Sequence, residues 1–515
     1  MQINQFLVIY MSILVFSLAK GQTQGTYNKT VYFYGDSVYT LNSVKSIVTD
    51  DTYIYISAAI VDNFTGQKLA VIKATMHGVL VNSILFHDSL ANIPTYPTNT
   101  LIMDRSGDLL VASNKAYKQF PTWDAYIMKL NKNLDTLWTR VYDLPATVAG
   151  YPADTILDNV ATAIKQTQDG GYIVTGHYRR IPQGTIDDRA FLLKIDTDGN
   201  VQWWRAYPNV LNGSYDIEVA PDSGYFITGI ISPMKLSIIK LSKQGDWEWS
   251  TQVNHTSKPA YPMGITLIDS TYIIVTSAVW ISAVDRLRNL VISKVDVNTR
   301  QLVFERQYYL YRSYINPELH STLSLRILAN KDILLCSTFC VRNPENNVVS
   351  HKGVLFRLNS DGDSLWSRYY GYGGWRDDCQ FNDVLITDDG GFLAAGFHFP
   401  WDGSYNAGAW LVKTDSLGFA PGSYPTGIEK PPALVSNFTI YPNPATDHTW
   451  IKLDDTGQAA SLNLLDLSGR IVSSHSIPRH SKEYQLNTPK LKSGIYLVSL
   501  IYESGQVVTT KLVVW

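Results

Sequence analysis

The sequence has few cysteines, and their spacing argues against a disulfide framework. Three occur among 515 residues, Cys336, Cys340 and Cys379. On one extended strand Cys336 and Cys340 would share a face about 13 Å apart, which is too far for a disulfide bond. A bond from either one to Cys379 stays open, but free and partly buried thiols are the simpler expectation.

An excess of charge of one sign is also missing. The formal net charge is −2 and the isoelectric point is about 6.6. Binding to nucleic-acid phosphates needs a concentrated surplus of Lys and Arg. We therefore expect no nucleic-acid partner.

Long hydrophobic runs are absent except at the N-terminus. Residues 6–19, FLVIYMSILVFSLA, have the length of a signal-peptide core, and small residues follow them. A membrane span needs about 18 to 20 apolar residues, so this run is short for one. We expect a signal peptide over residues 1–21, with cleavage after Gly21, although no Lys or Arg precedes the run. The alternative is an uncleaved anchor. The mature chain is then exported and has no membrane span.

Motifs of the common enzyme and cofactor classes are missing too. The chain has no G-x-S-x-G, H-E-x-x-H, Walker or dinucleotide-binding pattern. Residues 196–200, DTDGN, resemble the start of a calcium loop but lack the Glu at its twelfth position. His177 and His398 occupy similar repeats one position out of register, which puts them on opposite strand faces. We expect no metal and no cofactor.

What the sequence does have is a repeated strand pattern rich in aromatic and β-branched residues. The stretch QTQDGGYIVTGHY returns as ITDDGGFLAAGFHF about two hundred residues later. Each copy has four strand-like pieces separated by Gly-containing turns, as a propeller blade does. The seven copies cover residues 46–86, 101–142, 163–207, 218–253, 265–308, 325–370 and 384–418. The pattern predicts an all-β, seven-bladed β-propeller over residues 22–420.

The seventh copy lacks its own aromatic fourth strand. It runs from AWLVKTDSLGF into Pro421 and Gly422. Residues 30–35, TVYFYG, resemble the missing piece and precede the first copy. We expect this N-terminal strand to complete the last blade and close the ring, which removes an unpaired edge.

The repeat resembles a family of secreted bacterial propeller repeats. Its D-G-G-[YF] turn, L-[IL]-K-x-D-x-x-G segment and W-x-x-x-[YF] strand match residues 169–172, 192–199 and 203–207. Residues 369–378, YYGYGGWRDD, and the D-G-G-F turn at residues 389–392 match the same family pattern a second time. Several other copies lack one or more of the glycines. The resemblance implies a scaffold without fixing a ligand, because propellers carry many unrelated activities.

A separate small domain is expected at the C-terminus. Residues 421–436 form a Pro-rich linker of the extended type. Residues 437–515 then alternate apolar and polar positions over several short strands. A two-layer β-sandwich is the natural solution at this size.

This tail resembles the C-terminal sorting domain of proteins exported by the bacterial type IX secretion system. The resemblance implies export to the cell surface or medium and recognition by the secretion machinery. Pro442 and Pro444 would fix an extended entry, Gly469 a hairpin turn, and Gly494 would relieve crowding. Trp515 departs from the basic or small residue usual at the end, and a generic Fn3-like module is the alternative. The matching positions are Tyr441, Pro442, Asn443 and Pro444, the D-x-S-G-R turn from Asp466 through Gly469 and Arg470, Gly494 to Tyr496, and Lys511 to Val514.

Acidic residues in the longer loops are the candidates for catalysis. Adjacent acids usually point apart, and solvated turns commonly explain them, so we assign no catalytic residue and regard an enzyme as the less favoured class. The candidates are Asp187, Asp188 and Arg189, then Glu318 and His320, then Asp377 and Asp378.

Aromatic residues fall into two groups. Those that recur in the fourth strand, such as Trp138, Trp203 and Trp366, are expected to pack between blades. Aromatics in non-repeating loops are better candidates for ligand contact. We therefore expect an exported module that binds a glycan or a protein partner, with a polysaccharide or peptide hydrolase or lyase acting in the central depression as the alternative. The loop candidates are Trp123, Tyr311, Tyr314, Trp375, Trp401 and Tyr405.

Overall fold

The computed structural model divides the chain into two compact units, Met1–Gly427 and Ile428–Trp515. The predicted signal peptide and linker lie outside the described residues. The structure describes residues 26–31, 41–62, 66–96, 99–119, 122–180, 188–211, 213–231, 235–253, 260–282, 287–309, 324–342, 349–373, 376–401, 407–420, 438–453, 460–466, 471–488, 491–502 and 507–515.

Both units are built from antiparallel strands, and the described residues contain no helix. The all-β prediction is therefore confirmed. Over the same residues, no helix has the length and apolar character needed to cross a membrane.

The first half of the N-terminal unit forms three sheets. One holds β2 (Leu41–Thr49), β3 (Tyr53–Asp62), β4 (Gly66–Thr75) and β5 (Leu80–Phe86). The next holds β6 (Ala91–Asn92), β7 (Leu101–Met103), β8 (Leu109–Tyr117), β9 (Trp123–Leu130) and β10 (Thr136–Tyr142). An eight-stranded sheet holds β11 (Leu157–Gln166), β12 (Tyr172–Arg180), β13 (Arg189–Ile195), β14 (Val201–Leu211), β15 (Ile217–Val219), β16 (Tyr225–Ile231), β17 (Lys235–Leu241) and β18 (Trp247–Gln252).

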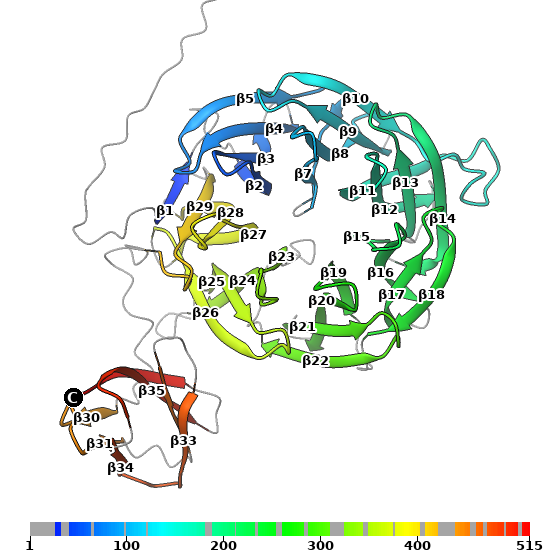
Figure 1. The fold of residues 1–515 in the computed structure, drawn as a ribbon. Helices are drawn as coiled ribbons and strands as arrows, with labels where there is room; N and C mark the ends of the chain where they lie inside the picture. The colour runs from blue at the N-terminus through cyan, green and yellow to red at the C-terminus, as the bar shows by residue number, and fades with distance from the viewer. Residues whose placement is uncertain are drawn as a thin grey trace, which may run out of the picture. The chain divides into compact units, whose positions relative to one another are not determined.

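Three four-stranded sheets complete the unit. The first holds β19 (Ala260–Leu267), β20 (Tyr272–Ser282), β21 (Leu287–Asp296) and β22 (Leu302–Tyr309). The second holds β23 (Ser324–Ile327), β24 (Ile333–Arg342), β25 (Val349–Leu358) and β26 (Ser364–Tyr370). The last holds β27 (Asp378–Ile386), β28 (Phe392–Phe399), β29 (Gly408–Thr414) and the N-terminal β1 (Tyr27–Val31). Figure 1 shows these sheets around a common centre, with β2, β7, β11, β15, β19, β23 and β27 innermost, so the unit is propeller-like.

The repeated Asp-Gly-Gly turn, which reads Asp-Ser-Gly at residues 222–224, has a clear physical role in three repeats. In three repeats a lysine near the end of the third strand is almost fully buried, and the turn aspartate neutralises it. Lys194 Nζ lies 3.0 Å from Asp169 Oδ2, and the same pair recurs at 2.7 Å for Lys240 with Asp222 and for Lys413 with Asp389. The turn aspartate and the lysine recur together in these repeats because they form an ion pair.

The repeated aromatics of the fourth strand join one sheet to the next. Tyr142 donates a hydrogen bond to the Gly199 carbonyl at 2.7 Å, and Tyr207 donates to Gly245 at 2.7 Å. Trp138 Nε1 donates to the Thr197 carbonyl at 3.2 Å. These contacts agree with the packing role expected for the recurring aromatics.

Strand β1 pairs with β29 as the outermost strand of the last sheet, with Lys29 opposite Leu411 and Val31 opposite Ala409. Its Tyr27 hydroxyl donates to the Met76 carbonyl of the first sheet at 2.8 Å. The acceptor Met76 lies two residues before the turn glycine Gly78, and Thr197, the acceptor of Trp138, lies two residues before Gly199. Tyr27 therefore occupies the position in the last sheet that Trp138 occupies in its own.

The position of this strand differs from the predicted residues 30–35. The described strand begins at Tyr27 and shares only Thr30 and Val31 with the prediction, while residues 32–35 lie outside the described residues. In several other repeats the fourth strand has Trp and Tyr at the first and last positions of W-x-x-x-Y, whereas here these positions are Tyr27 and Val31. A search for the usual aromatic residues therefore favours the Tyr-Phe-Tyr stretch that follows.

A second link between the chain ends is the fully buried Asp383 of β27. Its carboxylate accepts hydrogen bonds from Ser46 Oγ at 2.8 Å on β2 and from Arg326 Nη2 at 2.7 Å on β23. It also accepts the Ile47 N–H at 2.9 Å. One carboxylate thus holds the innermost strands of three sheets.

The C-terminal unit has two sheets that share one hydrophobic core. The first has the order β30 (Thr439–Tyr441), β31 (His448–Lys452) and β34 (Glu483–Asn487). The second has the order β33 (Ile471–Ile477), β32 (Ala460–Leu465), β35 (Gly494–Tyr502) and β36 (Val507–Val514). Ile451 from the first sheet and Leu462 and Leu500 from the second are completely buried in the core.

Removing β1 tests its structural role. A chain that begins at residue 32 loses five backbone pairs with β29 and the Tyr27 contact, and we expect about 3–5 kcal/mol less stability. Thermal unfolding measures the difference against a chain that begins at Thr26. Equal unfolding temperatures for the two chains would contradict this role.

Candidate functional site

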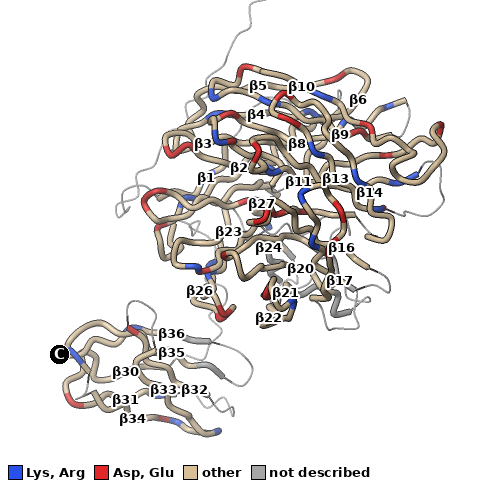
Figure 2. The backbone as a smooth tube through the Cα atoms, turned by 45° about the vertical axis from the view of Figure 1, so that its right-hand side comes forward, with Lys and Arg blue, Asp and Glu red and all other residues tan. Residues whose placement is uncertain are grey.

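The joint between the sheet of β7–β10 and the strands β11–β14 has two chemically different ends. We call the end with the tight turns at residues 104–108 and 196–200 the turn end. The opposite end, where β8, β10 and β12 finish and β9, β11 and β13 begin, is the loop end. Figure 2 shows acidic and basic residues interspersed along the chain. Several acids close together at one end of the joint therefore differ from the general pattern.

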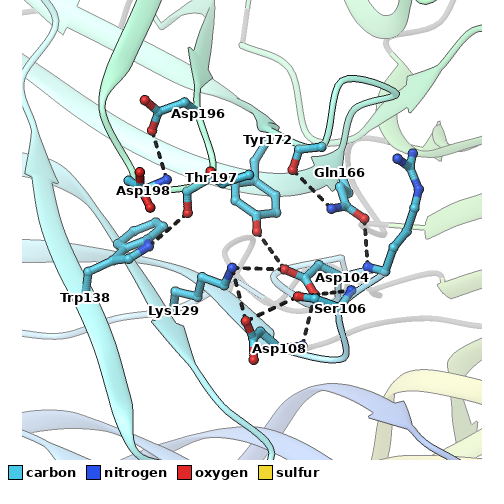
Figure 3. Close-up of polar contacts among 12 residues, drawn as sticks. Asp104, Ser106, Asp108, Lys129, Trp138, Gln166, Tyr172, Asp196, Thr197 and Asp198 are labelled. Atoms are coloured by element: carbon cyan, nitrogen blue, oxygen red, sulfur yellow. Dashed lines mark hydrogen bonds and ion pairs between the residues drawn. The ribbon is translucent and has the colours of Figure 1, made fainter.

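At the turn end, the buried Asp104 is fully paired (Figure 3). Its Oδ1 accepts Ser106 Oγ at 2.6 Å, and its Oδ2 accepts the Tyr172 hydroxyl at 2.7 Å. Lys129 Nζ lies 3.2 Å from Asp104 Oδ2 and 3.2 Å from Asp108 Oδ2. Burial alone would raise the pKa of Asp104, but these donors lower it to about 2. The turn end is a structural joint.

At the loop end, four aspartates come from four different segments. Asp124 lies on β9, Asp143 directly follows β10, Asp158 lies on β11, and Asp188 directly precedes β13. Burial and the neighbouring charge of Asp143 raise the pKa of Asp124 to about 6. Burial also raises the pKa of Asp143 and of Asp158, and the charge of Asp188 adds to the effect on Asp158. The acids therefore repel one another in a partly desolvated setting.

Basic groups compensate this charge only in part. Arg179 Nη2 lies 2.8 Å from Asp158 Oδ2, and Lys115 Nζ lies 2.8 Å from Asp88 Oδ2. Arg179 lowers the pKa of Asp158, and Lys115 lowers that of Asp124, yet both acids stay above their usual values. The ion pairs do not neutralise the cluster.

Several buried polar atoms at this end have no hydrogen-bond partner. Among them are Asp158 Oδ1, Asn159 Oδ1, His177 Nδ1 and Asp188 Oδ1. Asp158 is 2% exposed and Asn159 is 0% exposed, and Asn159 Nδ2 donates to Asp143 Oδ1 at 2.9 Å. An unsatisfied buried polar atom costs about 1–3 kcal/mol, so such a concentration is typical of a site that a ligand completes.

Aromatic rings surround these acids. The rings of Tyr96 and His177 lie 6.3 Å apart edge to face, and His177 lies 6.4 Å from the Tyr215 ring. Burial lowers the pKa of His177, which keeps the imidazole neutral at pH 7. Burial and the charge of Asp124 raise the pKa of Tyr117 to about 12. The loop end thus combines acids, neutral hydroxyls and ring faces.

The predicted binding aromatics lie at this end of the sheets only in part. Trp123 begins β9 and is half-buried, and its backbone N–H hydrogen-bonds the Asp158 carboxylate. Trp401 follows β28 in a different sheet, with 60% of its surface exposed. Tyr311, Tyr314, Trp375 and Tyr405 lie outside the described residues.

The predicted acidic candidates separate in the same way. Asp188 belongs to the loop-end cluster, and Arg189 begins β13 beside it. Asp187, Glu318 and His320 lie outside the described residues. Asp124, Asp143 and Asp158 stand alone among unrelated residues in the sequence and converge only when two sheets meet, so no local pattern predicts them.

Asp377 and Asp378 do not lie in a solvated turn, which corrects that expectation. Both are buried, and they point to different partners. Asp378 Oδ1 accepts the His351 backbone N–H at 2.8 Å and lies 2.9 Å from His351 Nδ1. Asp377 Oδ2 lies 3.3 Å from His398 Nε2, and His398 Nδ1 lies 3.1 Å from Thr30 Oγ1 on β1. The Asp378 pair joins the last sheet to β25 of the preceding sheet, and the Asp377 pair lies within the last sheet.

The thiols and histidines offer little chemistry. Cys336 and Cys379 are buried and free, and burial raises the pKa of Cys379 to about 12, so the reactive thiolate is scarce at neutral pH. His177 and His398 contact different neighbours in different sheets. Over the described ranges, no group of three or more His, Cys, Asp or Glu side chains could hold a metal ion.

The tail contains a second candidate site, where the YPNP residues hold the last strand. Asn443 Nδ2 donates to the Lys511 carbonyl at 2.7 Å, and Asn443 Oδ1 accepts the Val513 N–H at 2.8 Å. Ala445 adds backbone bonds to Val513 and Trp515. Two of the sequence landmarks are therefore one structural unit. Tyr441 and Lys511 are exposed and Tyr496 is half-buried, whereas Gly469 and Arg470 lie outside the described residues.

Two of the physical reasons expected for this tail are wrong. The chain bends at residues 442–444, so the entry is not extended. A Cβ atom on Gly494 would meet its nearest neighbour at 3.9 Å, so the glycine relieves no crowding.

The comparison with protein families decides the role of this unit. Residues 439–515 match the family described as the secretion system C-terminal sorting domain. The protein carries a type IX sorting domain. It is therefore exported by the type IX system to the cell surface or the medium.

Other comparisons add little. No curated protein matches the chain. Puromycin hydrolase has 14% identity and a TM-score of 0.45 over 80% of this chain and 58% of its own. The NanB sialidase of Streptococcus pneumoniae has 8% identity and a TM-score of 0.41 over 76% of this chain and 71% of its own. The acylaminoacyl peptidase of Pyrococcus horikoshii has 10% identity and a TM-score of 0.38 over 80% and 58%. The chain thus spans less than two thirds of two of these proteins, and TM-scores below 0.5 carry no inference about activity.

Paired substitutions test the contrast between the two ends of the joint. Asp124→Asn should stabilise the protein by about 1 kcal/mol at pH 7, after allowance for solvent screening, because the raised pKa makes ionised Asp124 unfavourable. The gain should vanish below about pH 4, where the carboxyl is protonated in both states.

Asp104→Asn is the matched control. It should destabilise the protein by about 3 kcal/mol at pH 7, because Lys129 and Tyr172 lose their carboxylate, and the loss should shrink as the pH falls towards 2. Denaturant unfolding at several pH values measures both effects. A loss of stability in both variants at pH 7 would contradict the contrast.

Asn443→Ala should loosen the terminal strand of the sorting domain, because two hydrogen bonds to β36 disappear. We expect hydrogen exchange at the Val513 amide to rise at least tenfold, with about 1–2 kcal/mol of local stability lost. Lys452→Ala on an exposed position of β31 is the control. Unchanged exchange at Val513 would show that the box does not hold the strand.

Proposed function

We propose that the N-terminal unit is a seven-bladed propeller that acts as a binding module outside the cell. Its blades would be β2–β5, β7–β10, β11–β14, β15–β18, β19–β22, β23–β26, and β27–β29 completed by β1. In support, the two halves of the eight-stranded sheet pair, among the described residues, through Val210 with Ile231 and Leu211 with Ile230 alone. The proposed mature chain runs from residue 22, with the propeller to 420, a linker at 421–436 and the sorting domain from 437.

The proposed ligand is a glycan or a protein partner that contacts the loop end of the sheets. The observation that carries this proposal is the set of unpartnered buried polar atoms around Asp158 and Asn159 at the loop end. At the turn end of the same joint, the buried Asp104 has a partner for each carboxylate oxygen. Trp123 borders the cluster and Trp401 offers an exposed ring on another sheet, which suits stacking on a sugar or a side chain.

A hydrolase is the second candidate, favoured by one observation. Asp124 has a pKa of about 6, in the range of a general acid, beside further carboxylates. Turnover that falls as the pH rises above about 6, and that is lost in Asp124→Asn, would favour this candidate over simple binding.

Binding screens test the proposed function directly. The exported full chain should bind at least one member of a panel of glycans and extracellular-matrix proteins. Trp123→Ala or Trp401→Ala should weaken that binding at least tenfold, because a stacked ring contributes about 1–3 kcal/mol. Trp247→Ala, at an exposed position at the start of β18, is the control. Silence across both panels, or equal loss in all three variants, would contradict the proposal.

A further inference from the structure

The loop-end cluster also indicates the chemistry of its ligand. Asp124, Asp143, Asp158 and Asp188 come from four segments that meet at the loop end, where Asn159, next to Asp158 on β11, donates its Nδ2 to Asp143 Oδ1 at 2.9 Å. The charges of Asp143 and Asp158 raise the pKa of Asp124, and the charge of Asp188 raises that of Asp158. The bases that lower those pKa values, Arg179 and Lys115, are already paired with Asp158 and Asp88. A ligand that carried positive charge would relieve the remaining repulsion.

The buried polar atoms without a partner also indicate which hydrogen-bonding groups the ligand must have. Asp158 Oδ1, Asn159 Oδ1 and Asp188 Oδ1 are all hydrogen-bond acceptors, and all are buried without a donor. Asn159 cannot satisfy its carbonyl by turning, because its amide nitrogen is bound to Asp143. The ligand must therefore supply several N–H or O–H donors to this region.

A metal ion fits these observations poorly. Over the described residues, no three carboxylates, histidines or cysteines are arranged to hold one. Tyr96 and Tyr117 instead lie near these acids, and tyrosine rings attract an organic cation. A guanidinium or ammonium group offers positive charge and several N–H donors together.

We propose that the loop-end cluster binds an organic cation with N–H donors, a guanidinium or a protonated amine, carried by the ligand of the exported module. This inference deepens the proposed function and rests on it for the biological role of the site. Two sources have this chemistry, an arginine side chain of a protein partner and an amino sugar of a glycan.

Isothermal titration of the full chain without its signal peptide tests the inference. The probes are arginine amide and glucosamine, at pH 7.5 and low salt. At least one should bind, and tetramethylammonium, which has the charge but no N–H donor, should bind at least tenfold more weakly. The stronger of the two probes identifies the source.

Variants locate the binding. Asp124→Asn and Asp143→Asn should each weaken the stronger probe at least tenfold, and thermal unfolding confirms that the variants are folded. Asp198→Asn, on an exposed turn at the turn end, should leave the affinity unchanged.

A pH series gives an independent readout. Affinity should fall as the pH drops through about 6, where Asp124 takes up a proton. Tyr117 and Lys115 on β8, Asp143 after β10 and Asp158 on β11 face this carboxyl, and Lys115 stays charged over the range.

Three results would overturn the inference: no heat with either amine, equal affinity for tetramethylammonium, or unchanged affinity in both cluster variants. Failure of the proposed function is separate, because it shows as silence in the glycan and protein panels. If the amines bind but no member of the glycan and protein panels does, the cation site is supported and the proposed partners are rejected.

Discussion

A charge buried between strands has to meet a partner, and this constraint organises the N-terminal unit. Lys194, Lys240 and Lys413 are almost fully buried, and each has the aspartate of its own tight turn as partner. The same constraint gives Asp104 its lysine and tyrosine, and gives Asp383 its contacts to three innermost strands. Where the constraint is met, the residues are structural. Where it is not met, at the loop end around Asp124, the structure has a candidate site.

Much of the fold follows from patterns that repeat. The Asp-Gly-Gly turn, the buried lysine and the strand aromatics recur because every sheet solves the same pairing problem, and so they are visible in the sequence. Features that occur once were harder to place. Tyr27 replaces the usual Trp in the closing strand, and the sequence pattern therefore predicts the strand a few residues too late, at the aromatics that follow. The bend at Pro442 and the open surroundings of Gly494 likewise depend on contacts that no local pattern contains.

The candidate site could be predicted only at its edges. Trp123 and Asp188 stood out as loop residues, but Asp124, Asp143 and Asp158 are single acids in three separate segments. Their proximity comes from the joint between two sheets, and their raised pKa values come from burial and from one another. Conversely, Asp377 and Asp378 are adjacent acids, which are expected from the sequence to point apart. Asp378 contacts His351 and Asp377 contacts His398, so the two carboxylates have different partners.

The export signal and the N-terminal unit are separate parts of the function. The sorting domain delivers the chain to the cell surface or the medium, and the proposed ligand would contact the loop end of the sheets there. The most direct test of this account is a carbon-13 titration of the aspartate carboxyls in the folded protein, assigned with the Asp104→Asn and Asp124→Asn variants. We expect the Asp104 signal to titrate near pH 2 and the Asp124 signal near pH 6. Titration of both near pH 4 would show that the two ends of the joint do not differ, and would contradict the account.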